Sequence, residues 1–66
     1  MQVYLNEKPK DIENGYTISQ LLEYLKIDKQ EVTIERNLKA VQKADYDGMV
    51  LKEGDRLEIV RFVGGG

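Results

Sequence analysis

The sequence predicts a small α+β domain in which one helix packs on one face of a mixed β-sheet. Three observations support this prediction. Segments that alternate apolar and polar residues lie near both ends of the chain, one amphipathic helical pattern follows the first of them, and 66 residues leave room for a single domain. A hairpin followed by a helix and further strands is typical of this fold class.

The first segment of the chain has the pattern of a β-hairpin. Residues 1–6 alternate between apolar and more polar side chains, as a half-buried strand does. We expect a polar turn at residues 6–9 and a short return strand at residues 10–13, with an irregular loop as the alternative for the second segment. Asn14-Gly15 then predicts a reversal of the chain.

The helix that follows is the best-marked element. Thr17 is a good N-cap residue, and Gln20, three positions later, completes the T-x-x-Q form of a capping box. Tyr16 and Leu21 occupy the positions of a hydrophobic staple. We expect the apolar stripe of this helix to face the core of the domain, the alternative being a seam for a partner helix. The stripe consists of Ile18, Leu21, Leu22 and Leu25.

The second half of the chain supplies the other strands. Residues 32–35 alternate as a strand, and residues 39–41 can form a short partner strand. Turn-rich stretches lie at residues 45–48 and 53–55, and residues 56–63 carry the longest strand pattern. If the last strand lies parallel to the first, the crossover between them is right-handed and the arrangement is a β-grasp, one of several small α+β folds that the pattern allows.

The composition excludes most chemistry. The chain has no His and no Cys, so a zinc site or a Cys/His or Ser/His catalytic pair cannot be built. A net charge of −2 argues against nucleic-acid binding, and neither a membrane span nor a signal peptide is predicted. The spacing of Asp45, Asp47 and Asp55 does not fit a calcium loop, so no metal site is expected. We expect a cytoplasmic protein without an active site of its own.

Three glycines, Gly64, Gly65 and Gly66, end the sequence directly after the last strand pattern. We therefore expect a folded domain at residues 1–63 and a flexible glycine tail at residues 64–66. Glycines cost backbone entropy to order and bury nothing, so a frayed end is the alternative to a function. A peptide without side chains can thread a narrow channel in another protein and present an unhindered terminal carboxylate there. This reasoning makes Gly66 the candidate reacting residue.

Several segments in order resemble the ThiS family of ubiquitin-like sulfur carriers. Residues 1–6 resemble the opening strand and Asn turn of this family, and residues 15–22 (GYTISQLL) resemble the start of its helix. Residues 51–60 (LKEGDRLEIV) are similar to its L-x-x-G-D turn into the last strand, and residues 62–66 match its di-glycine ending. One departure is Asn37-Leu38, where the family commonly has Asn-Gly in the middle hairpin.

The resemblance implies a protein cosubstrate rather than an enzyme. A ThiF-type enzyme would use ATP and Mg²⁺ to adenylate the carboxylate of Gly66, while Gly64 and Gly65 thread into the partner. A sulfur donor, such as a cysteine desulfurase, would supply sulfur to convert the adenylate to a thiocarboxylate. Thiazole synthase would then take the sulfur to build the thiazole ring of thiamin. The catalytic groups would belong to these partners.

The last strand also predicts a docking surface for these partners. Because side chains alternate along a strand, Leu57 and Ile59 share the face that packs on the helix, while Val60 and Phe62 point away from it. Exposed apolar residues beside a functional end favour a partner surface, with Arg61 flanking it. The alternative is that a loop covers Val60 and Phe62.

Other functions share parts of this pattern. A MoaD-like carrier for molybdopterin synthesis has the same fold, tail and adenylation step, but such carriers often have prolines before the tail, and Pro9 is the single proline of this chain. Sulfur delivery to tRNA by a related carrier is a further alternative. A ubiquitin-like modifier or an interaction module belongs to a different class, in which the tail is joined to lysines or is unused.

Overall fold

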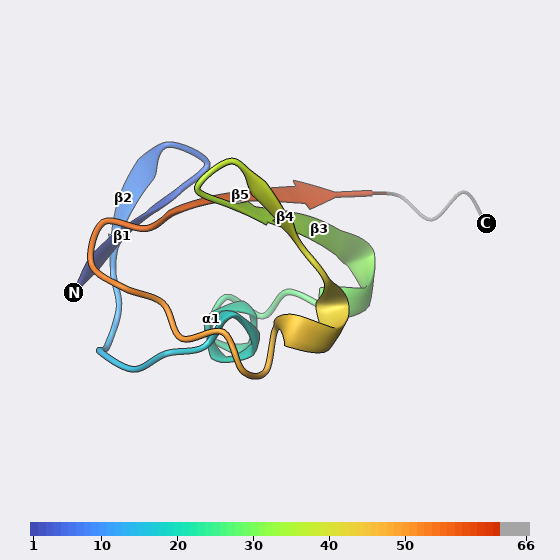
Figure 1. Cartoon of the computed structure of the whole chain (residues 1–66), viewed down its shortest axis with the longest axis horizontal. Helices are drawn as coiled ribbons and strands as arrows, with labels where there is room; N and C mark the ends of the chain where they lie inside the picture. Colours follow the sequence, from blue (N-terminus) through green and yellow to red (C-terminus); the bar gives the residue numbers. More distant parts are fainter. Residues whose placement is uncertain (63–66) are drawn as a thin grey trace.

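The computed structural model describes residues 1–62, in which a five-stranded sheet lies over one α-helix (Figure 1). The end of the last predicted strand at Val63 and the glycine tail lie outside the described residues. Two 3₁₀ turns, η1 (Lys29–Glu31) and η2 (Lys43–Asp45), lie in the connections. The strands and the helix are β1 (Gln2–Leu5), β2 (Lys8–Asp11), α1 (Ile18–Tyr24), β3 (Val32–Arg36), β4 (Lys39–Val41) and β5 (Arg56–Arg61).

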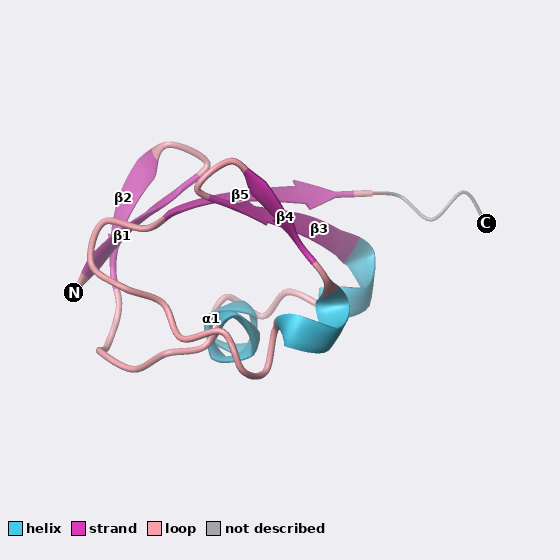
Figure 2. Cartoon of the chain, viewed as in Figure 1, coloured by secondary structure: helices cyan, strands magenta, loops and turns pink. Residues whose placement is uncertain are grey.

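The strand order of the sheet is β2-β1-β5-β3-β4. β1 and β5 are parallel, whereas the β1–β2, β3–β4 and β3–β5 pairs are antiparallel. The first and last strands therefore lie side by side in the middle of the sheet, and α1 covers one face of it (Figure 2). This is the β-grasp topology that the order of elements predicts.

Local signals fix both ends of α1. The predicted capping box is confirmed, because Gln20 N–H donates to Thr17 Oγ1 at 3.1 Å and Thr17 N–H donates to Gln20 Oε1 at 2.9 Å. At the other end, Lys26 adopts a positive φ of 58°. The N–H of Ile27 donates to the carbonyl of Leu22, and the N–H of Lys26 donates to that of Glu23, which is the hydrogen-bond pattern of a Schellman motif.

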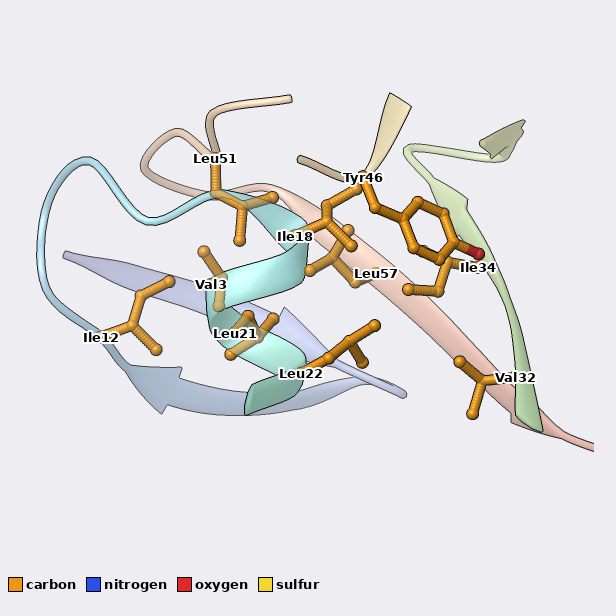
Figure 3. Packing of buried hydrophobic residues seen from close by; sticks show 10 residues of the cluster. All are labelled: Val3, Ile12, Ile18, Leu21, Leu22, Val32, Ile34, Tyr46, Leu51 and Leu57. Carbon is orange, nitrogen blue, oxygen red and sulfur yellow. The ribbon is translucent and has the colours of Figure 1, made fainter. Parts of the chain in front are cut away.

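The core lies between the helix and the sheet, as the predicted stripe requires (Figure 3). The sequence did not indicate that Tyr46 belongs to the core: it lies in the turn expected at residues 45–48, yet it is 1 % exposed and its ring lies beside Ile34. Burial raises the pKa of Tyr46, because ionising the phenol inside the core costs solvation. The core consists of Val3, Ile12, Ile18, Leu21, Leu22, Val32, Ile34, Tyr46, Leu51 and Leu57.

Both hairpins have two-residue turns. Leu5 pairs with Lys8, which leaves Asn6-Glu7 as the first turn, with φ values of 49° and 71°. Arg36 pairs with Lys39, which leaves Asn37-Leu38 as the second, with φ values of 51° and 73°. Two positive φ values are what a type I′ hairpin turn requires. Leu38, which replaces the glycine of the usual Asn-Gly turn, therefore adopts the backbone conformation that glycine favours.

The predicted boundaries of the first hairpin were wrong. The expected turn at residues 6–9 is shorter, and the return strand begins at Lys8 rather than at Lys10. Pro9 thus lies inside β2 and pairs with Tyr4. β2 is an edge strand, where the missing N–H of proline removes no ladder hydrogen bond if it faces outward.

The two turn asparagines hold β5 from opposite sides. Asn6 accepts a hydrogen bond from Ile59 N–H at 2.7 Å and donates to the Ile59 carbonyl at 3.1 Å, so its amide continues the β1–β5 ladder by one step. Asn37 accepts from Arg56 N–H at 2.9 Å on the β3 side. Side-chain amides therefore add to the main-chain hydrogen bonds that hold the central strand.

Asp55, just before β5, is the single buried charged residue among residues 1–62. Arg36 contacts Asp55 Oδ2 through Nη2 at 2.6 Å and through Nε at 2.9 Å. Lys52 N–H and Asn37 Nδ2 donate to the same carboxylate. Burial alone would raise the pKa of Asp55, but these hydrogen bonds and the Arg36 charge outweigh it and lower the pKa. The network fixes where β5 begins.

Candidate functional site

β5 leads directly toward the glycines. It is flanked by β1 on one side and by β3 on the other, so it is the middle strand of the sheet. Pairing with β3 extends to Arg61, and Phe62 N–H still donates to the carbonyl of Glu31 at 3.0 Å. β5 therefore ends at Arg61, and one further main-chain hydrogen bond follows it at Phe62, the last described residue. The predicted reacting residue Gly66, with Gly64 and Gly65, lies outside the described residues.

The outward face of this strand carries the two predicted apolar residues. Val60 is 55 % exposed and Phe62 is 42 % exposed. Lys43 Nζ lies 5.3 Å from the centroid of the Phe62 ring, a cation–π distance, so η2 partly covers this ring. Leu57 is buried on the opposite face, and Ile59 packs against the core there. We refer to Val60 and Phe62 as the outer patch.

Arg61 lies between Val60 and Phe62 in the sequence, but its side chain is on the opposite face of the strand from the outer patch. It shares the face of Ile59 and lines a groove beside the end of β5, together with residues from β1 and from the segment after α1. Sequence reasoning missed this groove. The apolar residue Ile27, shortly after the end of the helix, was a local signal for this groove. The residues that contact Ile27, however, depend on the tertiary fold.

The three aspartates that were considered as a metal cluster do not converge. Asp55 is occupied by Arg36, as described above. Asp47 accepts a hydrogen bond from Ser19 and lies 3.8 Å from Lys29 Nζ. Within residues 1–62, no three Asp or Glu side chains are grouped closely enough to hold a metal ion. Likewise, no helix among the described residues has the length and hydropathy needed to cross a membrane.

A β-grasp domain whose final strand continues toward three glycines has the make-up of a ubiquitin-like protein. Comparison with known proteins identifies the group within this class. The model of the ThiS family matches residues 3–66, which is nearly the whole chain and includes the glycines. The chain belongs to the ThiS family.

Solved structures and a curated relative agree with this assignment. The crystal structure of the thiamine biosynthesis protein ThiS from Geobacter metallireducens superposes with a TM-score of 0.86 at 30 % identity and covers all of both chains. The sulfur carrier protein ThiS of Bacillus subtilis is 40 % identical over 50 residues, which are 76 % of each chain.

Two further relatives are much longer proteins. The thiazole synthases of Paramagnetospirillum magneticum and Magnetococcus marinus are 38 % and 39 % identical to this chain over all 66 of its residues. The chain spans 20 % of the length of each. A segment similar to this whole chain is therefore part of a protein named thiazole synthase in both organisms.

Proposed function

We propose that this chain is a sulfur carrier of thiamin biosynthesis, and that it carries sulfur as a thiocarboxylate on Gly66. The observation that carries the proposal is the family match, which extends through residue 66 and so includes the three glycines. The name of the Bacillus subtilis relative, a sulfur carrier protein, supports the same function. A free carboxylate at Gly66 is part of the proposal.

The proposed chemistry begins at that carboxylate. One of its oxygens attacks the α-phosphate of ATP, with Mg²⁺ on the phosphates, and pyrophosphate leaves. The persulfide of the donor then attacks the acyl carbon of the adenylate and displaces AMP, which gives an acyl disulfide. A second thiol, such as free cysteine, reduces this S–S bond, so that the thiocarboxylate is released and the donor is left in a disulfide with that thiol. The absence of a side chain on Gly66 keeps the acyl carbon open to attack.

Partner enzymes supply the catalytic groups in this proposal, and the chain itself is their cosubstrate. A ThiF-type enzyme performs the adenylation, and a cysteine desulfurase provides the sulfur. Thiazole synthase is the acceptor, which is supported by the two relatives of that name that contain a segment similar to this chain.

We propose the outer patch, Val60 and Phe62, as a docking surface for these partners. Its two apolar side chains are exposed next to the segment that must enter a partner. Val60→Asp and Phe62→Asp, made separately, should weaken binding to the adenylating enzyme or to thiazole synthase while the proteins stay folded by circular dichroism. Leu38→Asp is the matched control, because it places the same charge on a residue that is 90 % exposed at a hairpin tip. Affinities equal to the control for both partners would reject this surface.

Adenylation can be tested by ATP–pyrophosphate exchange with the purified ThiF-type enzyme. Exchange should occur with the chain that ends at Gly66 and disappear when Gly66 is deleted or when residues are added after it. The reason is that the carboxylate must be both terminal and unhindered. Exchange at the normal rate with an extended chain would show that the carboxylate of Gly66 is not the reacting group.

A further inference from the structure

One edge of β5 has no neighbouring strand at its end. Phe62 N–H bonds to the Glu31 carbonyl on the β3 side, and along an antiparallel pair the hydrogen-bonded residues alternate. Val32 and Arg61 are therefore a non-hydrogen-bonded pair, and the N–H and C=O of Arg61 point away from β3. On that side the ladder ends at the bonds between Asn6 and Ile59. Among the described residues, neither main-chain group of Arg61 has a hydrogen-bond partner.

The groove beside the end of β5 adjoins this open edge. Five aliphatic side chains from four separate segments line it. Val32 is fully buried, and the other four are partly buried: Leu5, Leu25, Ile27 and Ile59. Unlike the outer patch, which lies on the face of one strand, this groove combines apolar side chains with the free main-chain N–H and C=O of Arg61. A sheet edge of this kind with side-chain pockets beside it is the surface that an added strand uses.

The charged residues that line the groove are of one sign. They are Lys8 and Arg61. No Asp or Glu is among the lining residues, all of which are described, although the chain as a whole has a net charge of −2. This local excess of positive charge complements a carboxylate on the bound segment.

We propose that this groove binds an extended segment of thiazole synthase, which carries apolar side chains and at least one carboxylate and pairs with the main chain of Arg61. The proposal rests on the sulfur-carrier function proposed above. It assigns thiazole synthase because a segment similar to this chain occurs within two proteins of that name. The position of the groove, beside the end of the strand that leads to Gly66 in the sequence, also supports this proposal.

Amide hydrogen exchange tests the strand pairing directly. In the free protein, the Arg61 amide should exchange rapidly, whereas its neighbour Phe62, bonded to Glu31, should exchange slowly and serves as the internal reference. With saturating thiazole synthase, exchange at Arg61 should slow by at least about tenfold, because a partner carbonyl accepts its N–H. Unchanged exchange at Arg61 in a complex whose formation is shown independently would overturn the proposal.

Charge reversal tests the complementarity. The double variant Lys8→Glu/Arg61→Glu should bind thiazole synthase at least about tenfold more weakly than the parent, because the rim then repels the carboxylate. Lys39→Glu/Lys52→Glu changes the net charge equally at exposed positions that do not line the groove, and it should bind like the parent. Equal affinities of the two double variants would contradict the proposal.

These outcomes are separate from the sulfur-carrier function. Formation of a thiocarboxylate with unchanged exchange at Arg61 in the thiazole synthase complex would reject the groove and leave the function standing. If no thiocarboxylate forms, the function itself fails, whatever the binding experiment gives. If the groove variants lose affinity for the ThiF-type enzyme but not for thiazole synthase, the assigned occupant is wrong.

Discussion

Leu38 is held in a conformation that suits glycine. It lies at the tip of the β3–β4 hairpin with a φ of 73°, where the Cβ of an L-residue is crowded, and its side chain is 90 % exposed. The side chain therefore gains little from burial to offset the strain of its backbone.

Leu38→Gly should raise the free energy of unfolding by about 1 kcal/mol, because glycine adopts this φ without a steric cost. Urea denaturation measures the change. Leu38→Ala is the control, since it removes the exposed aliphatic group but keeps the Cβ, and it should leave the stability nearly unchanged. Equal stabilities of the glycine and alanine variants would show that the backbone at residue 38 is not strained.

Asp55 links the stability of the chain to pH. The pKa of Asp55 is lowered in the folded protein. Burial alone would raise this pKa, but the hydrogen bonds from Lys52, Arg36 and Asn37 and the charge of Arg36 together have the larger effect and lower it. A carboxyl group with a lowered folded pKa contributes stability above its unfolded pKa of about 3.9. This contribution is lost as the pH falls through the folded value.

Asp55→Asn should therefore destabilise the chain at pH 7, by about 2 kcal/mol, because the donors around the site lose a charged acceptor. The difference between parent and variant should begin to shrink as the pH falls below about 4, where Asp55 of the unfolded chain becomes protonated, and should continue to shrink as the pH falls through its lower folded pKa. Unfolding measured from pH 7 to pH 3 gives both values. Asp47→Asn, at a side chain that is 77 % exposed, should show neither effect. A constant difference over this range would refute the linkage.

At the scale of elements, the helix was predicted well because its signals are local. The capping box and the spacing of the apolar stripe depend on neighbours within two turns, and both are found in the structure. The start of β2 was misplaced because Pro9 is a common turn residue, and its place on an edge strand depends on the order of strands. The turn at residues 45–48 was predicted correctly, but the burial of Tyr46 within it was not, because its neighbours Asp45, Asp47 and Gly48 are typical of exposed turns.

The hydrogen bonds between the Asn6 side chain and Ile59 link the turn after β1 to β5. Asn6→Gly keeps the positive φ of the turn but removes the amide that bonds to Ile59. We expect faster hydrogen exchange at the Ile59 amide and a loss of about 1 kcal/mol in unfolding free energy. Exchange at the Arg56 amide, which Asn37 holds independently, should not change relative to global unfolding. If the Ile59 amide keeps its protection, the Asn6 side chain does not secure the strand.

At the scale of the whole molecule, the parts of the site differ in how far the sequence predicts them. The outer patch follows from strand alternation, because Val60 and Phe62 are two residues apart on one strand. The groove could not be predicted in this way. Its lining combines residues of the β1–β2 hairpin, the segment after α1, β3 and β5. These segments are far apart in the sequence and meet only because β5 pairs with both β1 and β3.

The central claim is that Gly66 carries sulfur. The most direct test is the intact mass of the chain after incubation with the ThiF-type enzyme, ATP, Mg²⁺ and a cysteine desulfurase with cysteine. The account predicts a mass gain equal to the difference between one sulfur and one oxygen atom, located at Gly66 by fragmentation and absent from a chain that ends at Gly65. An unchanged mass, although the enzyme adenylates the chain, or adducts joined to lysines in its place, would contradict it.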